Sequence, residues 1–436
     1  MKFKHTTWAM IVFAMGGLFV AGYKMGGHDP AAKQDANESS TTAGVIPEGA
    51  QLPINHPPLT QAVMPKSAAT TMAGVQDPAA PSTPPRQHPV VLDRENPFTH
   101  FRVGNRNVKG IYVDGPITWI GTSGGVISYD TRNDSHKIYD NKSSGLLSNG
   151  IFFVGKVGDR IAAGTYGGGL SLLDRKTGTW QNYNIPQGLA DQFVYKVLTA
   201  SNGDVWIATW SGANRIAGGQ IDDSKKWDTF TVENTQGGLP NPWVYGLAEG
   251  RNGDMWFATE EGLALYRKGK WRHWKHSDGL GAPYAQVKDA IQFTNDPAAA
   301  SKHHARQKTA QGMDDVKVAY NPNYIISLVV DKDGIVWCGT WGGGLARFDG
   351  EHWRNFTTDD GLPANHIFML HLDDDDRLWA GTSNGLVRFD DDKKSFTIMT
   401  TADGLFADNV FSMDRGDDGS LWIGSFGGVA RIAARG

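Results

Sequence analysis

Apolar and polar residues alternate along the chain in a unit that recurs seven times. At its centre is a strand of the form Trp-x-Gly/Ala-Thr, followed by glycines. The copies begin at Trp119, Ala162, Trp206, Trp256, Trp337, Trp379 and Trp422, with spacings of 43, 44, 50, 81, 42 and 43 residues. A period near 43 residues is typical of a four-stranded propeller blade. The pattern predicts an all-β fold, a seven-bladed β-propeller over residues 93–436.

Each unit predicts four strands. An apolar inner strand such as 324–330 precedes an Asp/Gly turn such as 331–334, and the Trp strand follows. The third strand, as in 344–349, leads to a fourth that carries two large residues three positions apart. Alternating apolar and polar positions fit sheets that pack face to face.

The two ends of the repeat region complement each other. The last unit stops after its third strand, whereas Phe98 and Phe101 show the spacing of a fourth strand before the first inner strand begins near Asn107. We expect residues 97–103 to complete the last blade and close the ring, which removes exposed sheet edges.

The repeats also resemble a known family. Leu-Trp-Ile-Gly-Ser at 421–425, Gly-Gly-Leu-Ala-Arg-Phe-Asp at 343–349 and Asp-Gly-Leu-Pro-Ala-Asn at 360–365 are similar to two-component regulator propeller repeats. The resemblance covers residues 97–436. In that family such repeats commonly form the periplasmic sensor regions of hybrid histidine kinases, and the resemblance implies a similar sensor fold. This chain is expected to be a single stand-alone propeller without a kinase.

The N-terminal region differs in composition. Residues 6–23 are uncharged, with Lys2 and Lys4 before them and Lys24 after, which predicts a signal anchor or transmembrane helix over 1–25. Cleavage after a signal peptide is the alternative. Residues 26–92 are rich in Pro, Ala, Ser and Thr, which predicts a disordered linker. The predicted location is the inner membrane, single-pass, with the propeller in the periplasm.

Charge and cysteine content exclude several classes of function. A formal net charge of −4 gives no basic surface for nucleic acid. The one cysteine, Cys338, lies in an apolar strand and is expected to be buried, not reactive. The Asp-rich turn 373–376 lacks the ligand spacing of an EF-hand. We therefore expect no metal and no cofactor.

Two sets of residues are expected at one face of the ring. The first follows each conserved Thr or Ser: Ser123, Tyr166, Trp210, Glu260, Trp341, Ser383 and Phe426. The second starts the inner strands: Phe193, Trp243, Tyr324, His366 and Asn409. We predict a ligand- or partner-binding site formed by Tyr166, Trp210, Trp243, Glu260, Trp341, His366 and Phe426. The alternative interpretation is that the aromatic rings pack between blades.

The loops give two further predictions. The Asp-Gly-Leu segments 278–280, 360–362 and 403–405 are expected to be tight turns in which Gly takes a positive φ and Leu packs under a blade. An insertion at 281–322, with a basic run at 302–308, separates the fourth and fifth repeats and is interpreted as a docking or lid element.

These features favour binding over catalysis. The leading hypothesis is a membrane-tethered recognition or scaffold module for a protein partner, a membrane complex or an oligosaccharide. The alternatives are an accessory sensor that feeds a separate two-component kinase, and a lyase similar to streptogramin lyases that uses His366 and Glu260. No catalytic motif supports the last.

Overall fold

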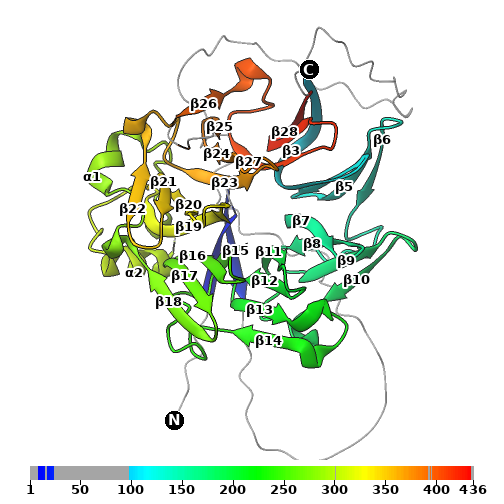
Figure 1. Ribbon diagram of the computed structural model, residues 1–436, viewed down its shortest axis with the longest axis horizontal. Helices are drawn as coiled ribbons and strands as arrows, with labels where there is room; N and C mark the ends of the chain where they lie inside the picture. The colour runs from blue at the N-terminus through cyan, green and yellow to red at the C-terminus, as the bar shows by residue number, and fades with distance from the viewer. Residues whose placement is uncertain are drawn as a thin grey trace, which may run out of the picture. The chain divides into compact units, whose positions relative to one another are not determined.

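The computed structural model describes residues 8–14, 17–23, 98–299, 301–390, 393 and 395–433. Within this part of the chain, residues 98–294 and 318–433 form an all-β propeller, as the repeats predicted. Figure 1 shows the first strands of the sheets around the centre and the fourth strands at the periphery. The predicted linker 26–92 lies outside the described residues.

Five of the sheets have four antiparallel strands each, in chain order from the centre outward. Two of them are β7(Ile151–Val157) β8(Arg160–Thr165) β9(Leu170–Asp174) β10(Thr179–Tyr183), and β11(Val194–Thr199) β12(Val205–Thr209) β13(Gly212–Ile216) β14(Trp227–Phe230). The next is β15(Val244–Glu249) β16(Met255–Thr259) β17(Gly262–Arg267) β18(Lys270–Trp274). The last two are β19(Asn321–Val330) β20(Val336–Trp341) β21(Leu345–Phe348) β22(Trp353–Phe356), and β23(Ile367–Leu372) β24(Leu378–Thr382) β25(Gly385–Phe389) β26(Phe396–Met399).

The sixth sheet corrects the predicted number of blades. Its order is β27(Val410–Arg415), β28(Leu421–Ile432), β3(Phe98–Asp114), β4(Ile117–Thr122), β5(Gly125–Asp130), β6(Ser135–Tyr139). The prediction of seven blades is wrong, since the propeller has six sheets. The reason is that β3 is one continuous strand: it pairs with β28 through Phe98–Arg102 and with β4 through Val108–Asp114. The expected pairing of the N-terminal strand with the last repeat is present, but it merges the first and last repeats.

The N-terminal apolar run also differs from the prediction. It forms two antiparallel strands, β1(Trp8–Ala14) and β2(Gly17–Tyr23), which pair from Trp8–Tyr23 to Ala14–Gly17. No helix in the described residues is long and apolar enough to cross a membrane. The predicted transmembrane helix is therefore wrong, and the inner-membrane location that depended on it is withdrawn. Gly16 and Gly17 interrupt the run at a point where a helix would need good helix formers.

The conserved threonine of each repeat has a clear structural role. Six threonines at the ends of the Trp strands are fully buried, and each hydroxyl donates to the carbonyl of a glycine three or four residues later. The bond from Thr209 to Gly212 is 2.8 Å long, and that from Thr340 to Gly344 is 2.7 Å. A buried hydroxyl needs a partner, so the Thr-to-Gly bond fixes the turn between the second and third strands.

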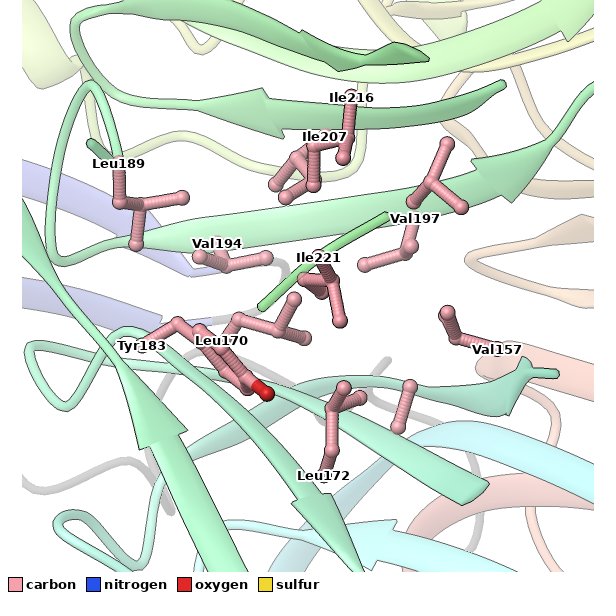
Figure 2. Close-up of a cluster of buried hydrophobic side chains, with 12 residues drawn as sticks. Val157, Leu170, Leu172, Tyr183, Leu189, Val194, Val197, Ile207, Ile216 and Ile221 are labelled. Atoms are coloured by element: carbon pink, nitrogen blue, oxygen red, sulfur yellow. The ribbon is translucent and has the colours of Figure 1, made fainter. Parts of the chain in front are cut away.

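Apolar side chains fill the space between neighbouring sheets. Figure 2 shows Leu170 and Leu172 of β9 facing Val194 and Val197 of β11, with Ile207 and Ile216 nearby. The first apolar residue of each inner strand, such as Val194, is fully buried. Cys338 is buried in the equivalent layer, where burial raises the pKa of its thiol, so it acts as a small apolar residue.

The Asp-Gly-Leu loops are turns. The segment Thr358–Asp360 is a short 3-10 helix in which Asp360 accepts from the backbone of Thr357 (2.9 Å) and Gly361 adopts a φ of 95°. The leucine that follows, Leu362, is 3% exposed. The loops at 278–280 and 403–405 repeat this arrangement.

The insertion between β18 and β19 has two parts. Its first part, with helix α1(Tyr284–Val287), and its last residues 318–322 belong to the propeller. Residues 295–317 belong to a separate compact unit and contain helix α2(Lys302–Ala310). Within that unit Lys308 pairs with Asp296 at 2.7 Å, so one charge of the basic run has a structural partner.

Candidate ligand-recognition site

Backbone hydrogen bonds bring the two predicted sets of residues together. In each case the residue after the conserved Thr donates its N–H to the residue that precedes the inner strand: Trp210 to Phe193 (3.2 Å), Glu260 to Trp243 (3.2 Å) and Ser383 to His366 (3.1 Å). Tyr166 does the same with Gly150, and Phe426 donates to the side chain of Asn409. The predicted residues therefore lie at one end of the propeller because the repeats share one backbone geometry.

Five aromatic rings form a continuous group at this end, which we call the aromatic cluster: Phe152, Tyr166, Phe193, Trp210 and Trp243. Tyr166 meets Phe193 edge to face at 4.8 Å, and Trp210 lies 3.9 Å from Trp243 between ring centroids. Trp210 and Trp243 are buried, whereas Phe152, Tyr166 and Phe193 are half-buried. The half-buried rings therefore offer surface to a ligand, and Phe193 packs on Trp210 with 5.8 Å between ring centroids.

Trp341 and His366 are covered by the insertion. The ring of Phe293 stacks on Trp341 at 5.7 Å and meets His366 edge to face at 4.7 Å. Nε2 of His366 donates to the carbonyl of Ala319 at 2.9 Å. Burial lowers the pKa of His366 to about 4. This histidine is therefore neutral near pH 7, and its ring packs between the insertion and β20.

Glu260 lies beside a group of buried tyrosines. It is fully buried, and the rings of Tyr245 and Tyr324 are 4.7 Å apart. Burial raises the pKa of both tyrosines, and the negative charge of Glu260 raises it further. Tyr245 and Tyr324 belong to the inner strands β15 and β19, so Glu260 lies close to these strands. Phe426, in contrast, is half-buried in β28 of the six-stranded sheet.

A second set of residues was not predicted from the sequence. Seven inner strands have a β-bulge one residue after their first buried apolar residue. The bulged residues are Lys109, Phe152, Tyr195, Tyr245, Ile326, Phe368 and Phe411. Neighbouring rings are in contact, as in Phe152–Tyr195 (4.7 Å) and Phe368–Phe411 (5.3 Å). The signal in the sequence was the recurring pair of Val or Ile followed by a large residue.

We expect Trp210→Ala to destabilise the propeller. Trp210 is 3% exposed and packs on Trp243, so its removal leaves a cavity that costs about 3–5 kcal/mol. Thermal denaturation followed by circular dichroism measures this loss. An unchanged melting temperature would contradict the packing role and assign Trp210 to ligand contact alone.

Comparison with known proteins agrees with the repeat geometry. Residues 238–261, 319–342 and 361–384 match the model of the two component regulator propeller. The chain carries two component regulator propeller repeats. Each matched segment runs from the turn before an inner strand to just past the residue after the conserved Thr, and the three together contain Trp243, Glu260, Trp341 and His366. No curated protein matches the chain significantly.

Several solved structures have a similar fold. The chain superposes on the extracellular domain of BT3049 from B. thetaiotaomicron, described as a hybrid two component system, with a TM-score of 0.56 and 19% identity over 77% of this chain. It spans 42% of that domain's length. Virginiamycin B lyase from Staphylococcus aureus superposes with a TM-score of 0.52 and 13% sequence identity, over 78% of this chain and 99% of the lyase. YCF48 bound to D1 peptide superposes with a TM-score of 0.50 and 12% sequence identity, over 78% of this chain and 98% of YCF48. At these identities the likeness establishes the fold alone.

Proposed function

We propose that the two component regulator propeller repeats form a recognition module that binds a peptide segment of a protein partner at the aromatic cluster. The observation that carries this proposal is the half-buried surface of Phe152, Tyr166 and Phe193, whose rings contact one another in series. Phe193 also packs on the buried Trp210. Rings held in place by packing provide contact area at a small entropic cost. The second candidate ligand class is an oligosaccharide whose sugar rings stack on the same aromatic side chains.

Polar groups beside these rings can orient a ligand. Asp191 accepts from Ser211 at 2.6 Å and from the backbone of Phe193 at 2.9 Å. Burial raises the pKa of Asp191, although these hydrogen bonds oppose the shift. A propeller of similar fold, YCF48, is found bound to D1 peptide, so this fold can present a peptide-binding surface.

Signal input to a separate two-component kinase is a second candidate function. It is favoured by the family match and by the likeness to the extracellular domain of BT3049. In this role the propeller would bind the same ligand and report its occupancy to a partner. A lyase function is less favoured, because His366 is neutral and its Nε2 is engaged by Ala319.

Binding of the purified protein to arrays of peptides and oligosaccharides tests the proposal. We expect the double variant Tyr166→Ala/Phe193→Ala to lose at least tenfold in affinity for the ligand selected, because two stacking surfaces are removed. Phe396→Ala, which removes a half-buried ring from outer strand β26, is the matched control and should bind as the parent does. Equal losses in both variants, or no selective ligand in either array, would contradict the proposed site.

A further inference from the structure

Lys109 differs from every other residue at its position in the repeats. The same β-bulge carries an aromatic residue in five of the other inner strands and Ile326 in the sixth. Lys109 is 9% exposed, and its ammonium group lies 4.7 Å from the centroid of the Phe152 ring. An aromatic or apolar residue would satisfy the packing that its neighbours show, so the lysine is not required by the fold.

The ammonium group has no carboxylate partner among the described residues. Its direct contact there is with the Phe152 ring. Burial lowers the pKa of Lys109 to about 7. Contact with an aromatic face compensates only part of the lost hydration of a cation. An anion placed next to Lys109 would supply the missing partner and hold the lysine in its charged form.

Lys109 is connected to the aromatic cluster through ring contacts. Phe152, on which it lies, is 4.7 Å from Tyr195 and 5.8 Å from Tyr166 between centroids. A ligand that stacks on Tyr166 and Phe193 therefore places a neighbouring group within reach of Lys109.

We propose that Lys109 is the anchor for a carboxylate on the ligand, and that the ligand class is one with a carboxylate next to an aromatic or apolar group. This inference rests on the proposed function, because it assigns a chemical group to the ligand of the same site. The ammonium group of a lysine forms a charge-assisted hydrogen bond with a carboxylate, which is stronger than a hydrogen bond between neutral groups.

Binding of 3-phenylpropanoate and its neutral isostere 3-phenylpropanamide, measured by calorimetry on the full chain, tests the assignment. The parent protein should bind the acid at least tenfold more tightly than the amide. Lys109→Met should abolish this preference, and Lys109→Arg should retain it. Lys196→Met is the matched control, since Lys196 is also on an inner strand over a phenylalanine, Phe153, at 5.2 Å, and it should leave the preference intact.

Several results would overturn the assignment. They are equal binding of acid and amide by the parent, binding of neither, or a preference that survives in Lys109→Met. Replacement of an unpaired buried charge by an apolar side chain should not lower the melting temperature. Thermal denaturation of Lys109→Met checks this, and an unchanged melting temperature shows that lost binding is not caused by unfolding. The arrays could identify a selective ligand that Lys109→Met binds with the same affinity as the parent protein. That result would support the proposed function and refute only the role of Lys109 as an anchor.

Two further probes identify the source of the carboxylate. A short peptide ending in phenylalanine, with a free or an amidated C-terminus, tests a peptide carboxylate. Oligogalacturonate against neutral oligogalactose tests an acidic oligosaccharide. The pair that reproduces the Lys109-dependent preference identifies the ligand class, and the assignment is refuted if neither pair does.

Discussion

Deletion of residues 98–103 is expected to leave the whole propeller unfolded at temperatures at which the parent protein remains folded. This segment supplies the β3 partner of β28, with Phe101 opposite Val429 and Phe98 opposite Ile432. Its removal exposes the edge of β28 and breaks the continuity of the six-stranded sheet. Phe101 also stacks on the buried Trp422 at 5.4 Å and meets Tyr129 edge to face at 4.9 Å.

A graded series separates edge exposure from side-chain loss. Phe101→Ala alone should lower the free energy of unfolding by about 3 kcal/mol, because removal of the ring leaves a cavity next to Trp422. Asn105→Ala, at an exposed position of the same strand, should change it by less than about 0.5 kcal/mol. Urea denaturation measures all three proteins. A deletion variant that melts with the parent would show that β3 does not hold the first and last repeats together.

Asp331→Ala is expected to lose about 2–4 kcal/mol of stability, because the indole N–H of Trp337 and two backbone N–H groups lose their acceptor. Lys393 keeps a second carboxylate partner, Asp376, at 2.7 Å. Asp331 is 3% exposed and accepts from Nε1 of Trp337 at 3.0 Å and from Nζ of Lys393 at 2.8 Å. Backbone N–H groups of the same turn add two more hydrogen bonds. The carboxylate thus joins the turn before β20, the Trp strand and a residue between β25 and β26.

The same residue predicts a pH dependence. Burial by itself would raise the pKa of Asp331, but hydrogen bonds from Lys393, Trp337 and Ile335 outweigh it, and the pKa is lowered. A folded-state pKa below the unfolded value stabilises the protein above the ordinary range near pH 4, and the contribution is lost as pH falls through the folded value. The difference in stability between the parent and Asp331→Asn should therefore shrink in acid.

An exposed neighbour provides the control for both measurements. Asp333 lies in the same turn, with 66% of its side chain exposed and a 3.5 Å ion pair to Arg251. Asp333→Ala should change stability by less than about 0.5 kcal/mol, because exposed ion pairs contribute little. If Asp333→Ala and Asp331→Ala lost equal stability, the effect would belong to the turn and not to the buried carboxylate.

The proposed site was partly visible in the sequence. Trp210, Tyr166 and Trp243 could be placed at one end because they hold fixed positions beside the conserved Thr and the inner strand. Their depth could not be predicted: Trp210 and Trp341 are buried, and Phe293, from an insertion without any repeat pattern, covers Trp341. Lys109 was missed because a β-bulge changes which side of a strand a residue faces, and period-two alternation does not reveal it.

The sequence by itself determined the all-β propeller, the order of strands within each repeat and the chemistry of its turns, because these follow from contacts between residues close in the chain. Hydrophobic alternation, the Thr-to-Gly bond and the Asp-Gly-Leu turn are all local. Only the tertiary structure decided that β3 continues without a break from β28 to β4, and that Trp8–Ala14 pairs with Gly17–Tyr23 as strands. The repeat pattern did predict that residues 97–103 pair with the last repeat. It does not contain whether that strand continues unbroken into the first repeat, or which distant loop buries an aromatic ring, because these depend on which segments meet in space.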